Sequence, residues 1–383
     1  GKEVPQLAMA KFFKDGDFRS GYYRDQTFMM AIGELTPQQF FAGLYGHTDI
    51  IQEPMSAGRQ MGGHFVTHSL NDDGSWKDLT IQKNSSSDIS PTASQMPRML
   101  GLAQASIIYR SIPELAHKTN FSKDGNEISW GTIGNASTSE GIFFETINAA
   151  GVLQVPIILS VWDDEYGISV HAKHQTTKES ISEILKGYQR DENHNGFEIL
   201  KVQGWDYPSL IETYEKAADL AREHHVPVVI HVSQLTQPQG HSSSGSHERY
   251  KDENRLSWER EFDCIRQMKL WMIAINIASP EEIEEIDIIT KKEVLEAKKL
   301  AWNAFQNPII EEQQSLIQLL EKVSPSCKNS DKLLKLKTNL NGIKSPLKKE
   351  VISTARKALR LMVNENSQPE LSNWITKFFN INQ

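Results

Sequence analysis

The stretch GNASTSEGIFFETINAAGVLQVPIILSVWDDEYGIS at residues 134–169 decides the fold. Ser137 and Glu140 form a capping box, which predicts a helix over residues 137–151 with its apolar side chains along one face. The apolar run at residues 155–161 predicts a buried strand after this helix. Another apolar run precedes the helix, so the chain alternates strand, helix and strand, as is typical of a parallel sheet.

The same alternation continues outward from this stretch in both directions. A polar turn is expected at residues 162–167. Strands are predicted at residues 128–133, 155–161, 197–202 and 227–233. Helices are predicted at residues 36–45, 95–110, 137–151, 178–186 and 207–224. We therefore predict an α/β fold, a three-layer, doubly wound parallel sheet.

The composition is that of a globular protein. A length of 383 residues with 38% hydrophobic and 23% charged residues is enough for one large or two ordinary domains. The net charge of −8 offers no broad footprint for nucleic acid or anionic lipid, so we expect neither partner. No apolar run approaches the roughly 20 residues that span a bilayer. Cys264 and Cys327 lie far apart in the sequence, which argues against a disulfide scaffold and suits a cytoplasmic location.

Three further segments differ in composition from the alternating region. Residues 56–91 are rich in Gly and Ser and are expected to form binding loops. Residues 234–253 are rich in Ser, Gly and His and are long enough for an active-site loop. Residues 280–359 are rich in Lys and Glu with helical periodicity, and we interpret them as a solvated helical arm, a surface or linker region. Turn breaks are expected there at Pro308, Pro325 and Gly342.

Several common catalytic motifs are absent from the sequence. There is no GxxxxGK[ST], no strand-linked GxGxxG, no HExxH and no GxSxG, which removes several enzyme classes. The small-residue turn at residues 134–141 joins a predicted strand to a predicted helix, where backbone N–H groups and the positive helix end favour a phosphate. If the turn at residues 134–141 is considered alone, an ordinary well-capped turn between strand and helix is the simpler interpretation.

The second polar feature follows the next strand. In a doubly wound sheet, two neighbouring strand ends can face the same crevice, which would bring Asn135 and Asp164 together. A carboxylate, an amide oxygen, a main-chain carbonyl and phosphate oxygens satisfy the about six positions around a hard cation such as Mg²⁺. A cation shared with a diphosphate is therefore one hypothesis. A solvated loop at Asp163 and Asp164 is the other.

The turn at residues 134–141 and Asp164 after the next strand make the sequence resemble the thiamine diphosphate enzymes. More narrowly, residues 134–169 are similar to the α subunit of the 2-oxo acid dehydrogenases, the decarboxylating components of multienzyme complexes. Four other patches follow the family order. They are YYRD at residues 22–25, GRQMGGHF at 58–65, SPTASQMP at 90–97 and GHSSSGSHERYK at 240–251. The resemblance covers roughly residues 1–260, and the last patch is nearer to the branched-chain than to the pyruvate enzymes.

The resemblance implies roles for individual residues. The implied Mg²⁺ ligands are Asn135, Asp164 and the carbonyl of Tyr166. The implied cofactor contacts are Tyr23, Arg24, Thr92, Gly134, Ala136, Ser137 and His241. His241 matches a histidine of the loop over the thiazolium, and His64 matches a second active-site histidine; either imidazole can exchange protons. A potassium ion beside the cofactor is implied at Ser90, Pro91, Ser94 and Gln95.

The sequence departs from the family at four positions in this region. Asn135 stands where the family has Asp, and Asp164 stands where it has Asn. One carboxylate is retained, so the charge offered to Mg²⁺ is unchanged, and we interpret the exchange as a compensated substitution. Ala136 replaces the second glycine of the Gly-Asp-Gly sequence with which the family's thiamine diphosphate motif begins. Trp162 occupies a position where branched-chain relatives have a basic residue near the phosphates.

The resemblance also implies partners. Residues 1–4, GKEV, are similar to a Gly-x-Glu-Ala motif that lies well inside the family's α subunit, so we expect a preceding helical segment. Nothing resembles the family's β half, so we expect a β subunit or a β half of the same polypeptide, in an α2β2-like assembly. The predicted domains are a thiamine diphosphate-binding domain at residues 1–265 and a helical extension toward the β half at 266–383.

The activity implied by the resemblance is oxidative decarboxylation of a 2-oxo acid, with transfer of the acyl group to the lipoyl arm of an acyltransferase component. One alternative is another thiamine diphosphate-dependent enzyme, a transketolase or non-oxidative decarboxylase, which would not acylate a lipoyl acceptor. The other alternative is a catalytically silent α-like subunit that keeps the fold for assembly. Ala136, Trp162 and the exchanged ligands favour this last interpretation.

Overall fold

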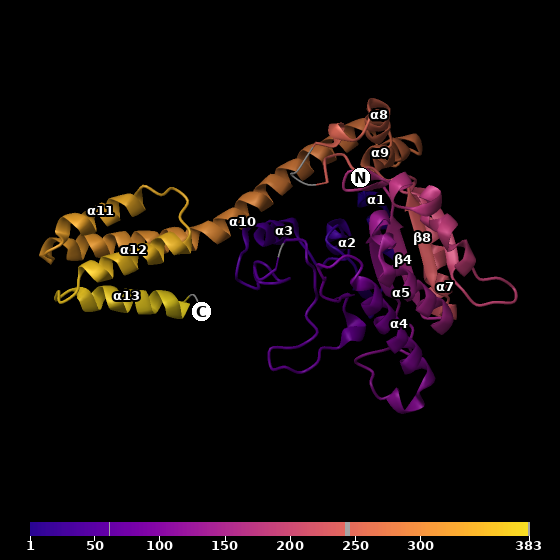
Figure 1. Ribbon diagram of the computed structural model, residues 1–383, viewed down its shortest axis with the longest axis horizontal. Helices are drawn as coiled ribbons and strands as arrows, with labels where there is room; N and C mark the ends of the chain where they lie inside the picture. Colours follow the sequence, from indigo (N-terminus) through magenta and orange to yellow (C-terminus); the bar gives the residue numbers. More distant parts are fainter. Residues whose placement is uncertain (61, 242–245, 382–383) are drawn as a thin grey trace. The chain divides into compact units, whose positions relative to one another are not determined.

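The computed structural model describes residues 1–60, 62–241 and 246–381. The described chain divides into two compact units, Gly1–Lys292 and Glu293–Gln383. The first unit contains the sheet and all the residues to which the sequence assigned a site (Figure 1). The predicted functional division at residue 265 stays a prediction.

One parallel sheet organises the first unit. Within the described residues its strand order is β2-β1-β3-β4-β8-β7, and every neighbouring pair is parallel. Its strands are β1 Phe18–Ser20, β2 Asn84–Ser85, β3 Ser129–Gly134, β4 Ile157–Trp162, β7 Glu198–Gln203 and β8 Val228–Ser233. A separate antiparallel pair consists of β5 Tyr166–Gly167 and β6 Val170–His171. The predicted doubly wound sheet is confirmed, whereas β1 and β2 are too short for their periodicity to be recognised in the sequence.

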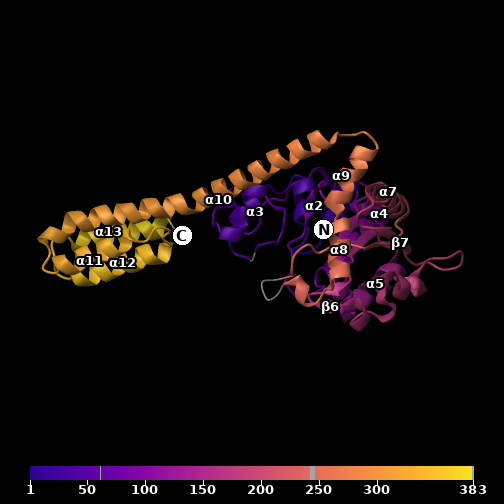
Figure 2. The same ribbon diagram turned by 90° about the horizontal axis from the view of Figure 1, so that it is seen from above.

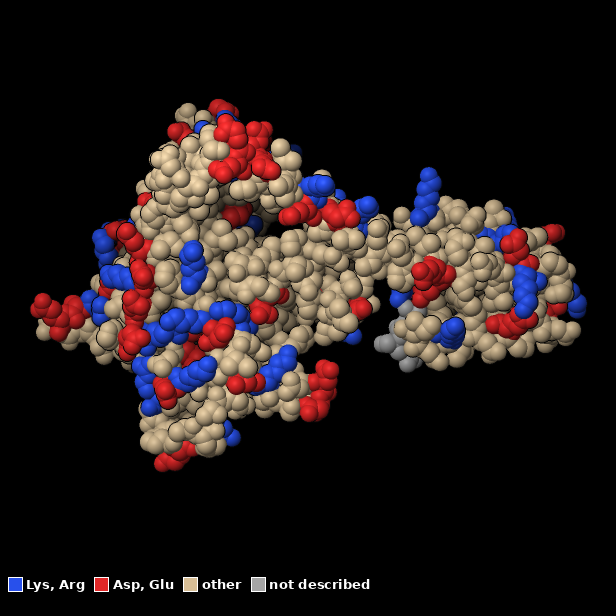
Figure 3. All heavy atoms as spheres, turned by 180° about the vertical axis from the view of Figure 1, so that it is seen from behind, with Lys and Arg blue, Asp and Glu red and all other residues tan. Residues whose placement is uncertain are grey.

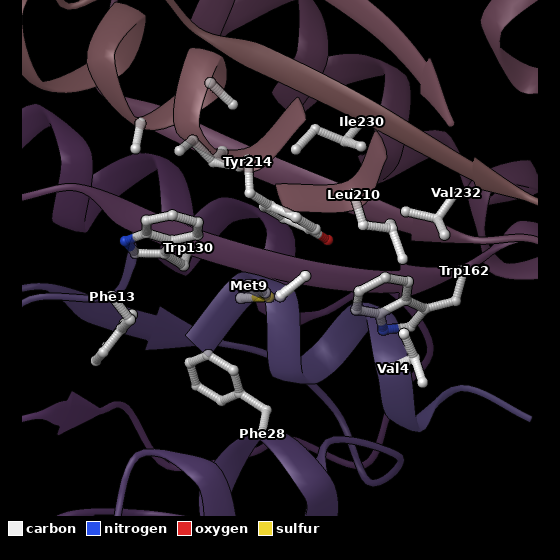
Figure 4. Close-up of a cluster of buried hydrophobic side chains, with 14 of the residues drawn as sticks. Val4, Met9, Phe13, Phe28, Trp130, Trp162, Leu210, Tyr214, Ile230 and Val232 are labelled. Carbon is white, nitrogen blue, oxygen red and sulfur yellow. The ribbon is translucent and has the colours of Figure 1, made fainter. Parts of the chain in front are cut away.

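Helices cover both faces of the sheet and complete three layers (Figures 1 and 2). The first face carries α1 Glu3–Phe12, α2 Gln26–Ala31 and α7 Tyr207–His224. The second face carries α4 Gln95–Ser111, α5 Gly141–Leu153 and α6 Ile181–Ile184. Side chains of β4 alternate between the two cores, because successive residues of a strand point to opposite faces. Ile158 and Trp162 pack in the first core, between the sheet and the helices of the first face, and Leu159 packs in the second core on the other face. Figure 4 shows side chains of the first core.

The remaining elements of the first unit are short. The other α-helices are α3 Pro37–Tyr45, α8 Glu253–Glu261 and α9 Cys264–Ala274. The 3-10 helices are η1 Leu79–Ile81, η2 Pro113–Leu115, η3 Asn135–Ser139, η4 Ala172–His174, η5 Thr177–Glu179, η6 Leu185–Tyr188 and η7 His247–Arg249. Thr36 caps α3 in a capping box with Gln39, so the predicted helix at residues 36–45 is confirmed.

The capping box predicted at Ser137 and Glu140 is wrong. A separate 3-10 helix, η3, occupies residues Asn135–Ser139, and α5 begins only at Gly141. Glu140 is the N-cap of α5 in an extended conformation, and its side chain makes no cap hydrogen bond. The small polar residues of the turn therefore curl tightly after β3 before the regular helix starts.

The helix predicted at residues 178–186 is interrupted. The backbone of Lys178 and Glu179 has φ angles of 65° and 54°, which a right-handed helix cannot contain. The segment therefore divides into η5, the single turn of α6 and η6. The helix predicted at residues 207–224 coincides with α7, in which the side chain of Asp206 accepts the backbone N–H of Ser209 as an N-cap.

The second unit has a hydrophobic core of its own, so the solvated arm predicted at residues 280–359 is wrong for residues 309–359. Residues 280–300 are largely exposed and helical, as predicted. The long helix α10 Pro280–Val323 continues through Pro308, so the break predicted there is wrong. It packs with α11 Ser330–Asn341, α12 Lys348–Leu361 and α13 Gln368–Ile381. The breaks predicted at Pro325 and Gly342 are confirmed by η8 Ser324–Ser326 and by the end of α11.

Pro308 is tolerated because the surrounding helix is well anchored. Leu316 and Leu320 are fully buried in the core of the second unit. Gln313, which is also buried, donates hydrogen bonds to the carbonyls of Leu340 and Ile343. These contacts offset the single backbone hydrogen bond that a proline removes from a helix.

The charged side chains of the chain are mixed. On the face shown in Figure 3, basic and acidic groups lie interspersed, in keeping with the net charge of −8. Within the described residues, none of the helices combines the length and the apolar character needed to cross a membrane.

Candidate functional site

The ends of β3 and β4 open onto a cavity of about 900 Å³ in the first unit. A cavity of this size accommodates a cofactor-sized ligand. The predicted site residues that line it are Tyr23, Arg24, His64, Ser90, Pro91, Thr92, Gln95, Gly134, Asn135, Ala136, Ser137, Asp164, Tyr166 and His241. Ser94 is not among the lining residues. The fold thus brings together residues from the five sequence patches, while their predicted roles stay predictions.

The turn after β3 forms one wall of the cavity. Asn135, Ala136 and Ser137 lie in η3, whose first N–H groups have no acceptor within the helix. Asn135 is buried, and among the described residues its amide nitrogen Nδ2 has no hydrogen-bond partner. This wall therefore offers hydrogen-bond donors to the cavity, which suits an anionic ligand.

Asp164 lies two residues after the end of the neighbouring strand β4, where it is buried and carries an ion pair. Its Oδ2 lies 2.6 Å from Nζ of Lys2, and its Oδ1 accepts the backbone N–H of Tyr166 at 3.2 Å. Burial by itself would raise the pKa of Asp164, but the Lys2 ammonium and the Tyr166 amide outweigh it and lower the pKa. The interpretation of this turn as a solvated loop is therefore wrong, because Asp163 and Asp164 are both buried.

The neighbouring Asp163 has a structural environment of its own. Its Oδ2 lies 2.8 Å from Nε2 of His231 in β8, and Nδ1 of the same ring lies 2.9 Å from Oγ of Ser182 in α6. All three side chains are buried. This chain of contacts ties the end of β4 to the second face of the sheet, so that the backbone carrying Asp164 is fixed.

Arg24 and His241 meet across the cavity. Nη2 of Arg24 lies 2.9 Å from Nδ1 of His241, and the guanidinium of Arg24 lies over the ring of Tyr23 at 5.1 Å. Because a guanidinium only donates, Nδ1 must be the acceptor and the neutral ring carries its proton on Nε2. Burial, followed by the charge of Arg24, lowers the pKa of His241 below its ordinary value of 6.5.

The loop at residues 90–95 lines the cavity beside His64. Nε2 of His64 lies 2.9 Å from Oγ of Ser90. Gln95 is buried. Its side-chain Nε2 donates to the backbone carbonyl of Thr132 in β3, and its backbone carbonyl accepts from the hydroxyl of Ser20. These contacts dock the predicted potassium loop onto the sheet.

A buried ionic network under the site was missed by the sequence analysis. Arg19 is fully buried and pairs with Asp25 and Asp88, and it also donates to the carbonyl of Tyr22. Asp88 in turn accepts the backbone N–H of Phe65 at 3.0 Å. The network therefore joins the patches at residues 22–25 and 58–65 to the loop that leads into 90–97. The acidic Asp25 within the patch YYRD is the one local feature that could have indicated this network, because a buried carboxylate needs a cationic partner such as Arg19.

Trp162 is the last residue of β4 and not part of a polar turn. Its side chain is fully buried in the first core, near Val4, Leu210 and Val232 (Figure 4). It also contributes to the cavity lining. At this position the chain therefore has an uncharged indole, and the positive charge at the site comes from Arg24 and Lys2.

Lys2 was also missed, because nothing in its sequence neighbourhood indicates a site. It precedes α1 and lies 162 positions from Asp164 in the sequence. Two patches of the resemblance are described only in part, since Met61 of GRQMGGHF and residues 242–245 of GHSSSGSHERYK lie outside the described residues. Lys251 of the second patch is buried and pairs with Glu259 of α8 at 2.7 Å, which anchors one end of that loop.

Comparison with known proteins gives the class to which this fold and site belong. The family model described as "Dehydrogenase E1 component" matches residues 1–309, and the chain belongs to this family. The predicted relationship to the thiamine diphosphate-dependent 2-oxo acid dehydrogenases is thereby confirmed.

Individual relatives are α subunits. The 2-oxoisovalerate dehydrogenase subunit alpha of Bacillus subtilis is 25% identical over 310 residues, which cover 79% of this chain and 82% of that protein. The mitochondrial 2-oxoisovalerate dehydrogenase subunit alpha 1 of Arabidopsis thaliana is 22% identical over 81% of this chain and 58% of its own length. The pyruvate dehydrogenase E1 component subunit alpha of Rickettsia bellii is 22% identical over 51% of this chain and 56% of its own length.

Proposed function

We propose that this chain is the α component of a 2-oxo acid dehydrogenase and holds the diphosphate end of thiamine diphosphate in the cavity at β3 and β4. The observation that carries the proposal is the convergence of Arg24, the η3 turn and His241 on that cavity. A guanidinium matches phosphate oxygens in a bidentate geometry, and the turn offers backbone N–H groups. When bound, the cofactor supplies the nucleophilic carbon and the electron sink for loss of CO₂ from a 2-oxo acid.

The two histidines of the cavity have different environments. His241 is held by Arg24 with its proton on Nε2, so this neutral ring can donate a hydrogen bond from Nε2–H to the reacting group. His64 is paired with Ser90 and lines the same cavity. We propose that His241 acts in transfer of the acyl group to the lipoyl arm of an acyltransferase component, and that His64 orients the 2-oxo acid.

We propose that a β subunit, or a β half of the same polypeptide, covers the mouth of the cavity in an α2β2-like assembly. Four large side chains with apolar surface line the cavity and are also exposed: Tyr23, Leu44, Ile168 and Val170. Apolar groups that rim a binding site in this way mark a surface that a partner covers. A two-component site would also explain why a cavity of this size remains open on this chain.

The predicted ions are less well supported than the diphosphate contacts. Mg²⁺ requires near-octahedral oxygen ligands at about 2.0–2.1 Å, whereas both oxygens of Asp164 are engaged, by Lys2 and by Tyr166. In this arrangement Asn135, Asp164 and the Tyr166 carbonyl do not fit a magnesium ion, and no step proposed here depends on one. A potassium ion at Ser90, Pro91, Ser94 and Gln95 stays a prediction.

The test is calorimetric titration of thiamine diphosphate into the chain purified with its β component, beside Arg24→Gln. We expect saturable binding to the wild type and binding weaker by at least about tenfold in the variant, since a charge-assisted contact to phosphate is lost. Arg59→Gln is the matched control, because Arg59 is exposed and does not line the cavity. The saturated assembly is then supplied with a panel of 2-oxo acids and a lipoyl acceptor.

The two alternatives give different results in the same experiment. No binding of the cofactor to a folded assembly would identify a catalytically silent α-like subunit and overturn the proposal. Binding and turnover without acylation of the lipoyl acceptor would identify a transketolase or a non-oxidative decarboxylase instead.

We also propose a cytoplasmic location. Cys264 and Cys327 are free and buried. Burial raises the pKa of the Cys264 thiol to about 11, so that this side chain stays a thiol at neutral pH. Unpaired thiols of this kind suit a reducing compartment.

A further inference from the structure

Lys2 is held rigidly at the cavity. It precedes α1, whose residues Val4, Ala8 and Met9 are buried in the first core. Lys2 itself is 9% exposed, and its ammonium donates to Oδ2 of Asp164 at 2.6 Å and to Oε1 of Gln237 at 3.1 Å. An ammonium has three donor hydrogens. Among the described residues two are used, which leaves one for a ligand in the cavity that Lys2 lines.

The cation at Asp164 is therefore supplied by the protein. An ammonium nitrogen 2.6 Å from a carboxylate oxygen occupies the side on which a magnesium ion would have to bind at about 2.0–2.1 Å. Two cations on one carboxylate oxygen repel each other strongly in a buried site. Lys2 also neutralises the charge of Asp164, so the carboxylate that the exchange of Asn135 and Asp164 retains is already paired within the protein.

The other groups around this position are donors as well. Nδ2 of Asn135 is buried and, among the described residues, lacks an acceptor. Arg24 contributes a guanidinium, and η3 contributes N–H groups. An array of donors without a free carboxylate binds an anion directly and gives a divalent cation little to coordinate.

We propose that Lys2 takes the place of the divalent cation, so that this chain binds the diphosphate of thiamine diphosphate without Mg²⁺. The proposal rests on the function proposed above, since it concerns the same cofactor. In it the ammonium of Lys2 bridges Asp164 and a phosphate oxygen, and Asn135 donates to the diphosphate through Nδ2. The exchange of Asp for Asn at residue 135 then has a physical reason, because a second carboxylate would repel the phosphate.

The experiment is calorimetric titration of thiamine diphosphate into the chain purified with its β component, once with EDTA and once with excess Mg²⁺. The wild type should bind equally well in both, within about threefold. Lys2→Gln should lose at least about tenfold in EDTA, and Mg²⁺ should restore its binding, because the freed carboxylate of Asp164 can then hold the metal. Lys2→Arg keeps the charge and should retain binding in EDTA. Lys11→Gln, at the exposed end of α1, is the matched control.

A second readout follows the metal itself. With thiamine diphosphate present, electron paramagnetic resonance of added Mn²⁺ should detect no tightly bound ion in the wild type and a bound ion in Lys2→Gln. Restoration by Mg²⁺ also shows that Lys2→Gln is folded.

Two results would overturn the proposal. If the wild type needs Mg²⁺ for binding, or holds Mn²⁺ stoichiometrically, Lys2 does not replace the metal, while the proposed function stands. If a folded wild-type assembly binds no cofactor with or without Mg²⁺, both the role of Lys2 and the proposed function are wrong.

Discussion

Nη2 of Arg24 lies 2.9 Å from Nδ1 of His241, although the two residues are 217 positions apart in the sequence. The contact fixes the tautomer of the imidazole, because a guanidinium donates and does not accept. It also places the Nε2–H of His241 and the charge of Arg24 side by side at the cavity. His241 and the patch at residues 22–25 therefore line the same cavity.

This contact predicts an unusual titration of His241. Its pKa in the folded chain lies below 6.5, because of burial first and of the Arg24 charge second. The unfolded chain therefore takes up this proton at higher pH than the folded one. The stability linked to His241 is present above pH 6.5 and is lost as the pH falls through the lowered pKa.

The measurement is a histidine NMR titration of wild type and Arg24→Gln, with the His241 signal assigned from His241→Gln. The Arg24→Gln variant should raise the pKa of His241 toward 6.5, and the exposed Arg59→Gln should leave it unchanged. A wild-type pKa at or above 6.5 would show that the ring is not held as described.

The second prediction concerns the role of His241 in the proposed activity. Replacement by Ala removes the Nε2–H donor from the cavity, and the rate of acylation of a lipoyl acceptor should fall by about 10²-fold or more. His194→Ala is the control, because His194 is exposed on a loop and does not line the cavity. Turnover of His241→Ala at the wild-type rate would exclude a catalytic role for this histidine.

The third prediction concerns the buried network under the site. Arg19→Met keeps much of the side-chain length but leaves the carboxylates of Asp25 and Asp88 buried without their cation. The free energy of unfolding should fall by about 3–5 kcal/mol. Urea unfolding measures this loss, with Arg59→Met as an exposed control expected to change stability by no more than about 0.5 kcal/mol. A loss below about 1 kcal/mol in Arg19→Met would mean that the network contributes little.

The fourth prediction tests the continuity of α10. Pro308 is exposed inside the helix, so Pro308→Ala restores a backbone N–H at little cost in packing. The second unit should become more stable by about 1–3 kcal/mol. Pro325→Ala is the control: Pro325 lies in the first turn of η8, where proline is well accommodated, and the same change should be neutral or slightly destabilising. Thermal unfolding compares the two, and a less stable Pro308→Ala would show that the helix depends on its proline.

Much of the fold could be predicted because its signals are local. The helix at residues 207–224 coincides with α7, since its cap, its apolar face and its C-terminal end all lie within the segment. The four predicted strands were found from short apolar runs that alternate with helical patterns. The helices predicted at residues 137–151 and 178–186 were wrong for the same reason. In both segments the local sequence pattern favours a continuous helix, but the backbone at Glu140 and at Lys178 is not helical.

The candidate site could be predicted only in part. Gly134, Asn135 and Ser137 were found because a turn between strand and helix has a recognisable composition and a known place at the edge of a parallel sheet. Lys2, Arg19 and Trp162 could not be placed in the same way. A lysine before a helix, an arginine in a three-residue strand and a tryptophan at the end of an apolar run have no local feature that indicates a partner.

The sequence by itself determined the class of fold, the order of the elements and the set of residues at the strand ends. These features follow from hydrophobic periodicity, helix-capping residues and turn composition, which all depend on residues that are close in the chain. Only the tertiary structure decided which of these residues meet. The docking of α1 on the sheet places Lys2 against Asp164, and the course of the chain at residues 234–241 brings His241 to Arg24. Such contacts follow from how the layers pack, and packing brings together residues whose separation in the sequence carries no information about their distance in space.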